Sequence, residues 1–368
     1  MEPKQRSMFE WAMLLGLFFF ITALGASLWY FSNDKDIKKP VVGIVLLGDR
    51  NEEGWNAPQY RGMKKACDAM GVELLVSDNN SGLDGKCADA VRKMVENGAG
   101  MVFLTSYSYT ADGKTLIREF PQVAFGTNSA ECRGRNMTSY FIRMYQGRYL
   151  TGALAGMRTK SNVIGYVAAM PNSEVNRGIN AFTLGVQRTN PNARVVVMYT
   201  GSWENEEVEE EHTYRLITQE KADVITYHQD EPMAATVAEK MGVDYIGYYE
   251  DLQNGSEHDL TSIMCNWDRY YEDIVRYYLK GEMNFVDNRW VGMEADLVEL
   301  SQLSDAVTYE QRTVLKQLKK EMLAGRFVFA GEIFDNKGRR RCQPNEVIRD
   351  EYLLQHMDWL VKGVDVLE

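Results

Sequence analysis

The sequence predicts an α/β protein with two lobes, each a doubly wound parallel sheet, and a ligand cleft between them. Two observations predict this fold. Residues 41–47 are a run of β-branched and aliphatic side chains, as in a strand buried on both faces of a parallel sheet. Such runs alternate with helical patterns through most of the 368 residues, a length that exceeds one typical domain.

The first lobe is expected to contain four strands and the helices between them. After the strand at 41–47, a polar loop at 48–56 precedes a helix whose apolar residues recur at steps of three and four up to Met70. Ligands of open α/β sheets bind beyond the carboxyl ends of the strands, so the polar segments after these strands are candidate binding loops. The later predicted elements are strand 72–76, helix 87–96, strand 101–104 and strand 122–125.

A second series of the same kind predicts the second lobe. Repeated strand–helix alternation predicts right-handed crossovers, with helices on both faces of the sheet. The glutamates of 204–211 open one of these helices and are interpreted as a solvated face near its N-terminus. The other predicted elements are helix 145–158, strand 162–169, helix 177–188, strand 194–199, strand 223–226 and strand 245–248. Two lobes in tandem suggest a cleft that closes by hinge motion around a small ligand.

Aromatic residues recur where the predicted strands end or the chain re-enters the cleft: Trp55, Tyr107, Trp203, Tyr249 and Trp267. An aromatic plate from each lobe would sandwich a flat heterocycle, while amides and carboxylates would bind its polar edge or a sugar hydroxyl. The candidates for this second role are Asn56, Glu174, Asp230 and Asp251. For Trp55 two interpretations stay open, a stacking plate and a buried anchor of its loop.

Composition and motifs argue against catalysis, metal binding and nucleic-acid binding. The net charge is −11, from 41 basic and 52 acidic residues, and no basic stripe is present. The sequence lacks GxSxG, HExxH and phosphate-loop motifs, and it has no GxGxxG after the first strand. Its four histidines and five cysteines show no metal-ligand spacing. His228, at a strand exit, is interpreted as a pocket-wall or structural residue rather than a catalytic base. We therefore expect no enzyme, no cofactor and no metal.

The N-terminus predicts a membrane anchor. Residues 11–31 are uncharged and mostly apolar, and at about 1.5 Å per residue they would reach about 31 Å, close to the thickness of a bilayer core. Basic residues precede this run and aromatic residues mark both ends, as in a span with its N-terminus inside the cell. A cleaved signal peptide is the alternative, because small residues occur at 23–27. We expect a cytoplasmic N-terminus at 1–10, the anchor or uncleaved signal at 11–31, a tether at 32–39 and an extracytoplasmic domain.

Several segments resemble one family. They are GDRNEEGWNAPQYRGMKKA in the first loop and helix, the long block from Met144 to Val195, ADVITYHQDEP, and MDWLVKGV near the end of the sequence. These segments resemble the BMP family (basic membrane protein, Med/PnrA-like) of ABC-transporter substrate-binding lipoproteins. The resemblance implies the type I periplasmic-binding-protein fold, a purine base or purine nucleoside as ligand, and ABC permease subunits as partners.

The resemblance also implies lobe boundaries and a set of site residues. Crossings near Tyr140, Tyr248 and Asn288 would give a first lobe of 40–140 plus 249–288 and a second lobe of 141–248 plus 289–368. Together with the strand exits, it implies that the ligand is bound by Asp49, Trp55, Asn56, Ser106, Tyr107, Met170, Glu174, Trp203, Asp230, Tyr249, Asp251 and Trp267.

Two features depart from the family pattern. Tyr249 stands where the family's G-x-D-x-D loop has its first aspartate, and a tyrosine cannot accept two hydrogen bonds from a ribose diol as a carboxylate does. A free base or another aromatic ligand therefore stays open beside a nucleoside. The apolar segment is not followed by a lipobox cysteine, so the segment itself would be the anchor.

These observations predict an extracytoplasmic solute-binding protein that delivers a purine-like ligand to an ABC importer. The alternative is a membrane-anchored sensor or adaptor of the same fold that signals through a membrane partner. A nucleoside hydrolase would need a calcium-binding aspartate cluster or a well-placed base, and the sequence displays neither.

Overall fold

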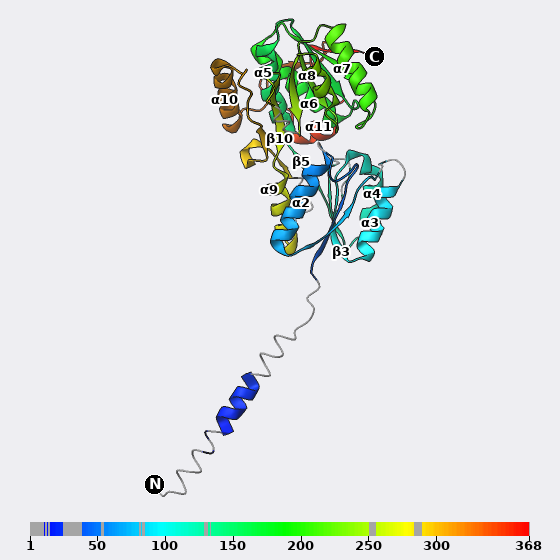
Figure 1. The fold of residues 1–368 in the computed structure, drawn as a ribbon, viewed down its shortest axis with the longest axis vertical. Coiled ribbons are helices and arrows are strands. Elements are labelled where there is room, and N and C mark those ends of the chain that lie inside the picture. Colours follow the sequence, from blue (N-terminus) through cyan, green and yellow to red (C-terminus); the bar gives the residue numbers. More distant parts are fainter. Residues whose placement is uncertain are drawn as a thin grey trace. The chain divides into compact units, whose positions relative to one another are not determined.

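Figure 1 shows the fold of the chain in a computed structural model. The structure describes residues 11, 13, 15–24, 39–52, 55–80, 82, 85–128, 132, 134–249, 255–282 and 289–367. The chain forms two compact units, Met1–Lys39 and Pro40–Glu368, which we describe separately.

In the first unit, residues 15–24 form a helix whose apolar side chains are exposed. The hydroxyl of Thr22 donates to the carbonyl oxygen of Phe18 at 2.9 Å within this helix. The expected span over 11–31 includes residues outside the described set. Among the residues that are described, no helix is both long enough and apolar enough to cross a bilayer.

The first lobe of the larger unit is a parallel sheet in the order β11-β5-β4-β3-β1-β2. Helices α2 and α9 cover one face and α3 and α4 the other, with a separate apolar core on each side (Figure 1). The elements are β1 (Val41–Val45), α2 (Asn56–Met70), β2 (Glu73–Ser77), α3 (Lys86–Glu96), β3 (Ala99–Leu104), η1 (Tyr107–Tyr109), α4 (Thr110–Glu119), β4 (Ala124–Thr127), β5 (Met137–Ile142), α9 (Trp267–Leu279) and β11 (Arg289–Val291).

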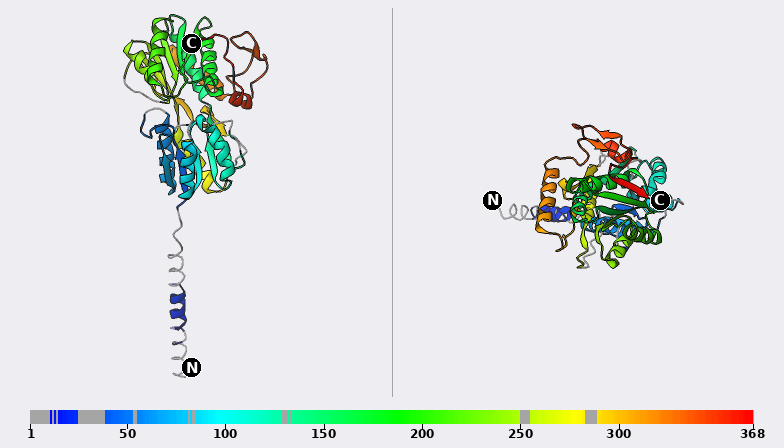
Figure 2. Two further views of the ribbon diagram at one scale, coloured as in Figure 1. Left: turned by 90° about the vertical axis from the view of Figure 1, so that its right-hand side faces the viewer. Right: turned by 90° about the horizontal axis from the view of Figure 1, so that it is seen from above.

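The second lobe is a sheet in the order β12-β10-β9-β8-β6-β7-β15, parallel except for the β10–β12 pair. The segment with β13, β14 and α11 packs on the outside of this lobe beside α6 (Figure 2). The elements are α5 (Met144–Arg158), β6 (Val163–Ala168), α6 (Ser173–Thr189), β7 (Arg194–Tyr199), α7 (Glu206–Thr218), β8 (Val224–His228), α8 (Met233–Lys240), β9 (Asp244–Tyr248), β10 (Asp259–Cys265), η2 (Met293–Ala295), β12 (Val298–Leu300), α10 (Tyr309–Leu323), β13 (Ile333–Phe334), β14 (Arg340–Cys342), α11 (Asp350–Gln355) and β15 (Val364–Leu367).

Local chemistry explains where these elements begin and end. The side chain of Asn172 accepts a hydrogen bond from the Val175 N–H at 2.9 Å and so caps α6. Thr308 and Gln311 form a capping box at the start of α10. Helix α2 ends at Gly71, whose φ of +67° lies in the left-handed region that glycine adopts without strain. The predicted α/β fold with parallel sheets is confirmed. All five cysteines, each among the described residues, are free thiols.

Helices α5 and α6 pack so closely that two positions of their contact, both glycines, have no room for a Cβ atom. A Cβ atom added to Gly152 would lie 1.9 Å from the carbonyl oxygen of Phe182, and one added to Gly185 would lie 2.0 Å from that of Tyr149. Both glycines belong to the long block that carries the family resemblance. This close approach fixes α6, and with it the two pocket residues Glu174 and Arg177.

The chain passes between the lobes at 142–144, 265–267 and 291–293. Strand β10 therefore lies in the second lobe, whereas the resemblance assigned all of 249–288 to the first lobe. The reason is that Leu260 and Ile263 are buried when β10 pairs in parallel with β9. Only after β10 does the chain return to the first lobe, where α9 packs against α2.

Candidate functional site

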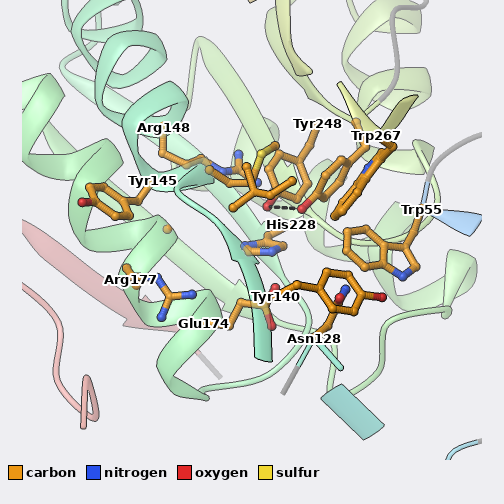
Figure 3. Close-up of a pocket in the computed structure, with 14 residues that line it drawn as sticks. Trp55, Asn128, Tyr140, Tyr145, Arg148, Glu174, Arg177, His228, Tyr248 and Trp267 are labelled. Carbon is orange, nitrogen blue, oxygen red and sulfur yellow. Dashed lines mark hydrogen bonds between the residues drawn. The ribbon is translucent and has the colours of Figure 1, made fainter. Parts of the chain in front are cut away.

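A pocket lies between the two lobes, at the carboxyl ends of β4, β8 and β9 and at the N-termini of α2 and α6. It has two adjoining halves that share six lining residues: Trp55, Asn128, Glu174, His228, Tyr248 and Tyr249. We call the half that adds Ser106, Tyr107, Trp203 and Asp230 the aromatic half. The half that adds Tyr140, Arg148, Arg177 and Trp267 is the guanidinium half (Figure 3).

Trp55 is fixed at the pocket by a hydrogen bond and by two aromatic neighbours. Its Nε1 donates to the carbonyl oxygen of Thr105 at 2.8 Å. Its ring meets those of Tyr249 and Trp267 edge to face, with centroids 4.8 and 5.6 Å away. Trp267 in turn stacks on Tyr271 at 5.8 Å inside the first lobe. The two interpretations of Trp55 are therefore compatible, because the indole both anchors its loop and lines both halves of the pocket.

Asn128 is oriented by the same carbonyl group. Its Nδ2 donates to the Thr105 oxygen at 3.2 Å, and its backbone N–H donates to Leu104 at 3.2 Å. The side chain is 95% buried, and among the described residues its Oδ1 has no hydrogen-bond partner. One backbone carbonyl thus holds both an indole plate and an acceptor oxygen at the pocket.

Tyr248, Tyr249 and His228 form an aromatic wall from the second lobe. Figure 3 labels two of them, Tyr248 and His228. The ring centroids of His228 and Tyr248 are 4.5 Å apart, those of Tyr248 and Tyr249 are 4.2 Å apart, and the two hydroxyls are 3.4 Å apart. Tyr249 has a φ of +63°, which is strained for a non-glycine residue and is typical of functional loops. Burial, together with Arg148 and Arg177, holds the pKa of His228 well below its usual range, so the imidazole is neutral.

Two arginines close the guanidinium half. Arg148 is completely buried and donates to Thr226 Oγ1 at 3.2 Å and to the Tyr227 carbonyl at 2.7 Å. Its guanidinium carbon lies 3.7 Å from the ring centroid of Tyr248, so an aromatic face takes the place of a counterion. Arg177 donates to the Leu353 carbonyl at 2.7 Å, which ties α6 to the end of α11.

Among the described residues, two with carboxyl groups line the pocket, Glu174 and Asp230. Burial raises the pKa of Glu174 to about 7, and the neighbouring Arg177 offsets only part of this effect. The pKa of Asp230 is raised well above its usual range by burial and by the acids Glu204, Glu52, Glu174 and Glu231. These carboxyls therefore carry protons over part of the neutral range.

Eight of the twelve residues predicted from the sequence line this pocket: Trp55, Ser106, Tyr107, Glu174, Trp203, Asp230, Tyr249 and Trp267. Met170 instead lines a more open cavity beside it, which Tyr107 and Trp203 also border. Asp49 is exposed and accepts from the Asn51 N–H at 2.7 Å, and Asn56 is buried and accepts from the Leu47 N–H at 3.0 Å. Both are occupied in holding the first loop. Asp251 lies outside the described residues.

The sequence-based set did not include several lining residues. Asn128 and Tyr248 lie at or just after the ends of β4 and β9, so strand exits alone indicate them. Arg148, Arg177 and Tyr140 lie inside α5, α6 and β5, where no local pattern separates a pocket residue from a core residue. A charged residue on an otherwise buried helix face was the available signal for the two arginines.

Two α/β lobes with a small-molecule pocket between facing strand ends define a solute-binding protein of the periplasmic-binding-protein class. The chain belongs to the family of PnrA-like ABC transporter substrate-binding proteins, Bmp, which it matches over residues 39–328. The resemblance inferred from the sequence is thereby confirmed.

Individual relatives differ in the ligand that their names state. The chain is 28% identical over 331 residues to a purine-binding protein of Brucella abortus, covering 89% of this chain and 93% of that protein. It is 31% identical over 267 residues to a putative ABC transporter glucose-binding protein of Haloferax volcanii, covering 72% and 65% of the two proteins. A solute-binding protein of an Aeropyrum pernix ABC transporter shares the fold, with a TM-score of 0.67 at 15% identity over 78% of this chain and 92% of that chain.

Proposed function

We propose that the chain binds a purine base or nucleoside between its two lobes and delivers it to the permease of an ABC importer. The observation that carries this proposal is the aromatic lining of the pocket, to which both lobes contribute. Trp55 and Tyr107 come from the first lobe, and Trp203 and Tyr249 from the second. Such a lining favours a flat heterocycle over a hexose. The name of the Brucella relative agrees with a purine.

In the proposed complex the ring stacks on Trp55, and Asn128 and Asp230 bind its polar edge. Ligand binding selects the closed arrangement of the lobes, which the permease then recognises. Where the family pattern has an aspartate, this chain has Tyr249, which offers a ring face and one hydroxyl. The missing carboxylate would bind a ribose diol, so a free base does not need it.

Isothermal titration calorimetry and thermal unfolding of the full-length chain test this function, with purine bases, their nucleosides and glucose as ligands. We expect a saturable heat with purines and none with glucose. A purine at a hundred times its dissociation constant should add about 2.7 kcal/mol to the free energy of unfolding. Binding of glucose and of no purine would contradict the purine assignment and would identify the ligand as a sugar.

We further propose that residues 11–31 anchor the chain, with Pro40–Glu368 outside the cytoplasm and a permease as partner in the membrane. Protease added to intact spheroplasts should then remove the folded unit while a cytoplasmic marker protein stays whole. A folded unit that resists until the cells are lysed would contradict this topology.

A further inference from the structure

The aromatic half of the pocket lies among carboxyl groups from both lobes. Asp230 and Glu174 line it, Glu204 and Glu231 adjoin it in the second lobe, and Glu52 belongs to the β1–α2 loop of the first lobe. They are near enough for mutual repulsion, which contributes to the raised pKa of Asp230 and of Glu231, the latter about 7. Among the described residues, Arg177 offsets part of the effect of burial on Glu174, whereas the charges that act on Asp230 and Glu231 are those of other acids. Above about pH 7, Glu174 and Glu231 are mostly ionised, so these acids then give the aromatic half of the pocket a negative potential.

An independent feature also calls for a hydrogen-bond donor on the ligand. Asn128 Oδ1 is a buried acceptor without a partner in the described part of the chain, and the bond from Nδ2 to Thr105 prevents the amide from turning its nitrogen to the pocket. Leaving a buried acceptor unpaired is unfavourable, so the ligand is expected to supply an N–H there. The indole N–H of Trp203, likewise unpaired among the described residues, offers one donor for a ring nitrogen.

The two arginines, Arg148 and Arg177, do not make the pocket favour an anionic ligand. Arg148 directs its Nη atoms at Thr226 and Tyr227 and covers the face of Tyr248, and Arg177 donates to Ser173 and Leu353. Both belong to the guanidinium half of the pocket. Although Arg177 lies beside Glu174, burial raises the pKa of Glu174 by more than the cation lowers it.

We propose that this site selects aminopurines, flat heterocycles whose edge carries an amino group beside a ring nitrogen, and rejects purines that are anions near neutral pH. The inference rests on the proposed function and specifies its ligand class. The amino group donates to Asn128 Oδ1 and to a carboxyl group, and the ring nitrogen accepts from an N–H such as that of Trp203. An anionic oxopurine would bring a negative charge among these carboxyls and would present oxygens to the acceptor of Asn128.

Calorimetry with the full-length chain and a matched ring series tests the selection. Adenine and 2,6-diaminopurine carry the amino edge, hypoxanthine lacks the amino group, and xanthine and urate lose a ring proton near or below neutral pH. We expect xanthine and urate to bind about tenfold or more weakly than adenine at about pH 8. The affinity for xanthine should rise when the pH is lowered to about 6, where both the ring and the carboxyls take up protons.

An isosteric variant isolates the electrostatic contribution. Asp230→Asn should narrow the ratio of adenine to xanthine affinity several-fold, because it removes the carboxyl and keeps the shape. Glu210→Gln is the matched control, since it also replaces a carboxyl with its amide, at an exposed position on α7. It should leave the ratio unchanged. Thermal unfolding of both variants establishes that they are folded.

The outcomes separate this inference from the function on which it rests. Tight binding of adenine with weak binding of urate supports both. Binding of hypoxanthine as tightly as adenine overturns the selection for an amino edge, and binding of xanthine or urate as tightly as adenine overturns the rejection of anions. In both cases the purine-binding function stands. Failure of every purine to bind overturns both proposals.

Discussion

The indole of Trp55 holds its loop and lines the pocket, so replacing it tests both roles separately. Trp55→Ala should weaken purine binding by about 1–3 kcal/mol, in the range of base–aromatic stacking. Calorimetry measures the affinity and thermal unfolding the stability. Trp55→Phe, which keeps a ring but loses the N–H bond to Thr105, should recover much of the affinity. An unchanged affinity in Trp55→Ala with a lowered melting temperature would leave only the anchoring role.

Glu209 contradicts the interpretation of the glutamate run as a wholly solvated face. It is completely buried between α7 and α8, where Oε1 accepts from the Ala234 N–H at 2.9 Å. Oε2 has no partner among the described residues, and burial raises the pKa to about 8 from an ordinary value of 4.5. The position of Glu209 on helix α7, rather than the composition of the run, places its side chain on the buried face of the helix.

A pH-dependent stability follows from that buried carboxyl. Because the folded state keeps a proton that the unfolded state releases, the free energy of unfolding should fall as the pH rises from about 4.5 to about 8. Glu209→Gln cannot lose a proton and should be more stable than the parent at about pH 8, on the order of 2 kcal/mol, and similar to it at about pH 5. Urea unfolding at both pH values measures this, with Glu210→Gln as the exposed control. Parallel pH profiles for Glu209→Gln and the parent would contradict the assignment.

At the scale of elements, the contact between α5 and α6 depends on glycine. Alanine is the better helix former by about 1 kcal/mol, so propensity alone predicts that Gly152→Ala stabilises the chain. The Cβ would instead lie 1.9 Å from the Phe182 carbonyl oxygen, and we expect a loss of about 1–3 kcal/mol in the free energy of unfolding. Denaturant unfolding measures it, and Gly185→Ala, across the same contact, should act in the same direction. A raised melting temperature for either variant would contradict this prediction, because it would mean that the two helices can move apart with little loss of free energy.

At the scale of the whole molecule, the carboxyls that face each other across the cleft couple the closure of the two lobes to the binding of protons. Glu52 of the first lobe raises the pKa of Asp230 and Glu231 in the second, and burial raises that of Glu174 and Glu231 to about 7. Opening the cleft separates and hydrates these groups, so the closed form binds more protons. Closure should become less favourable as the pH rises from about 4.5 toward 7.

Proton uptake on ligand binding measures this linkage. Titrating adenine at about pH 6.5 in two buffers of different ionisation enthalpy should reveal a fractional uptake of protons. Glu52→Gln should reduce the uptake, because it removes the first-lobe carboxyl that raises the pKa of Asp230 and Glu231. Identical heats in the two buffers would mean that the carboxyls keep their protonation states when the lobes close.

The periodicity of the sequence was enough to predict the α/β fold. It located the ends of β3 and β7 at the observed residues, and it placed the ends of β1 and β8 two residues from the observed ones. Because parallel strands end at one edge of a sheet, the residues after them, among them Trp55, Tyr107, Trp203 and Asp230, were identifiable as a set. These are local properties of the backbone, and a single sequence carries them.

Tertiary structure alone decided which side chains reach the pocket and in what charge state. Asn56 turns inward to hold its own loop, β10 pairs with the second lobe, and Arg148 reaches the pocket from the interior of a helix. Glu209 is buried within a run of exposed acids. Each of these outcomes depends on contacts between residues far apart in the chain, and burial and charge at such contacts have no periodic signature in the sequence.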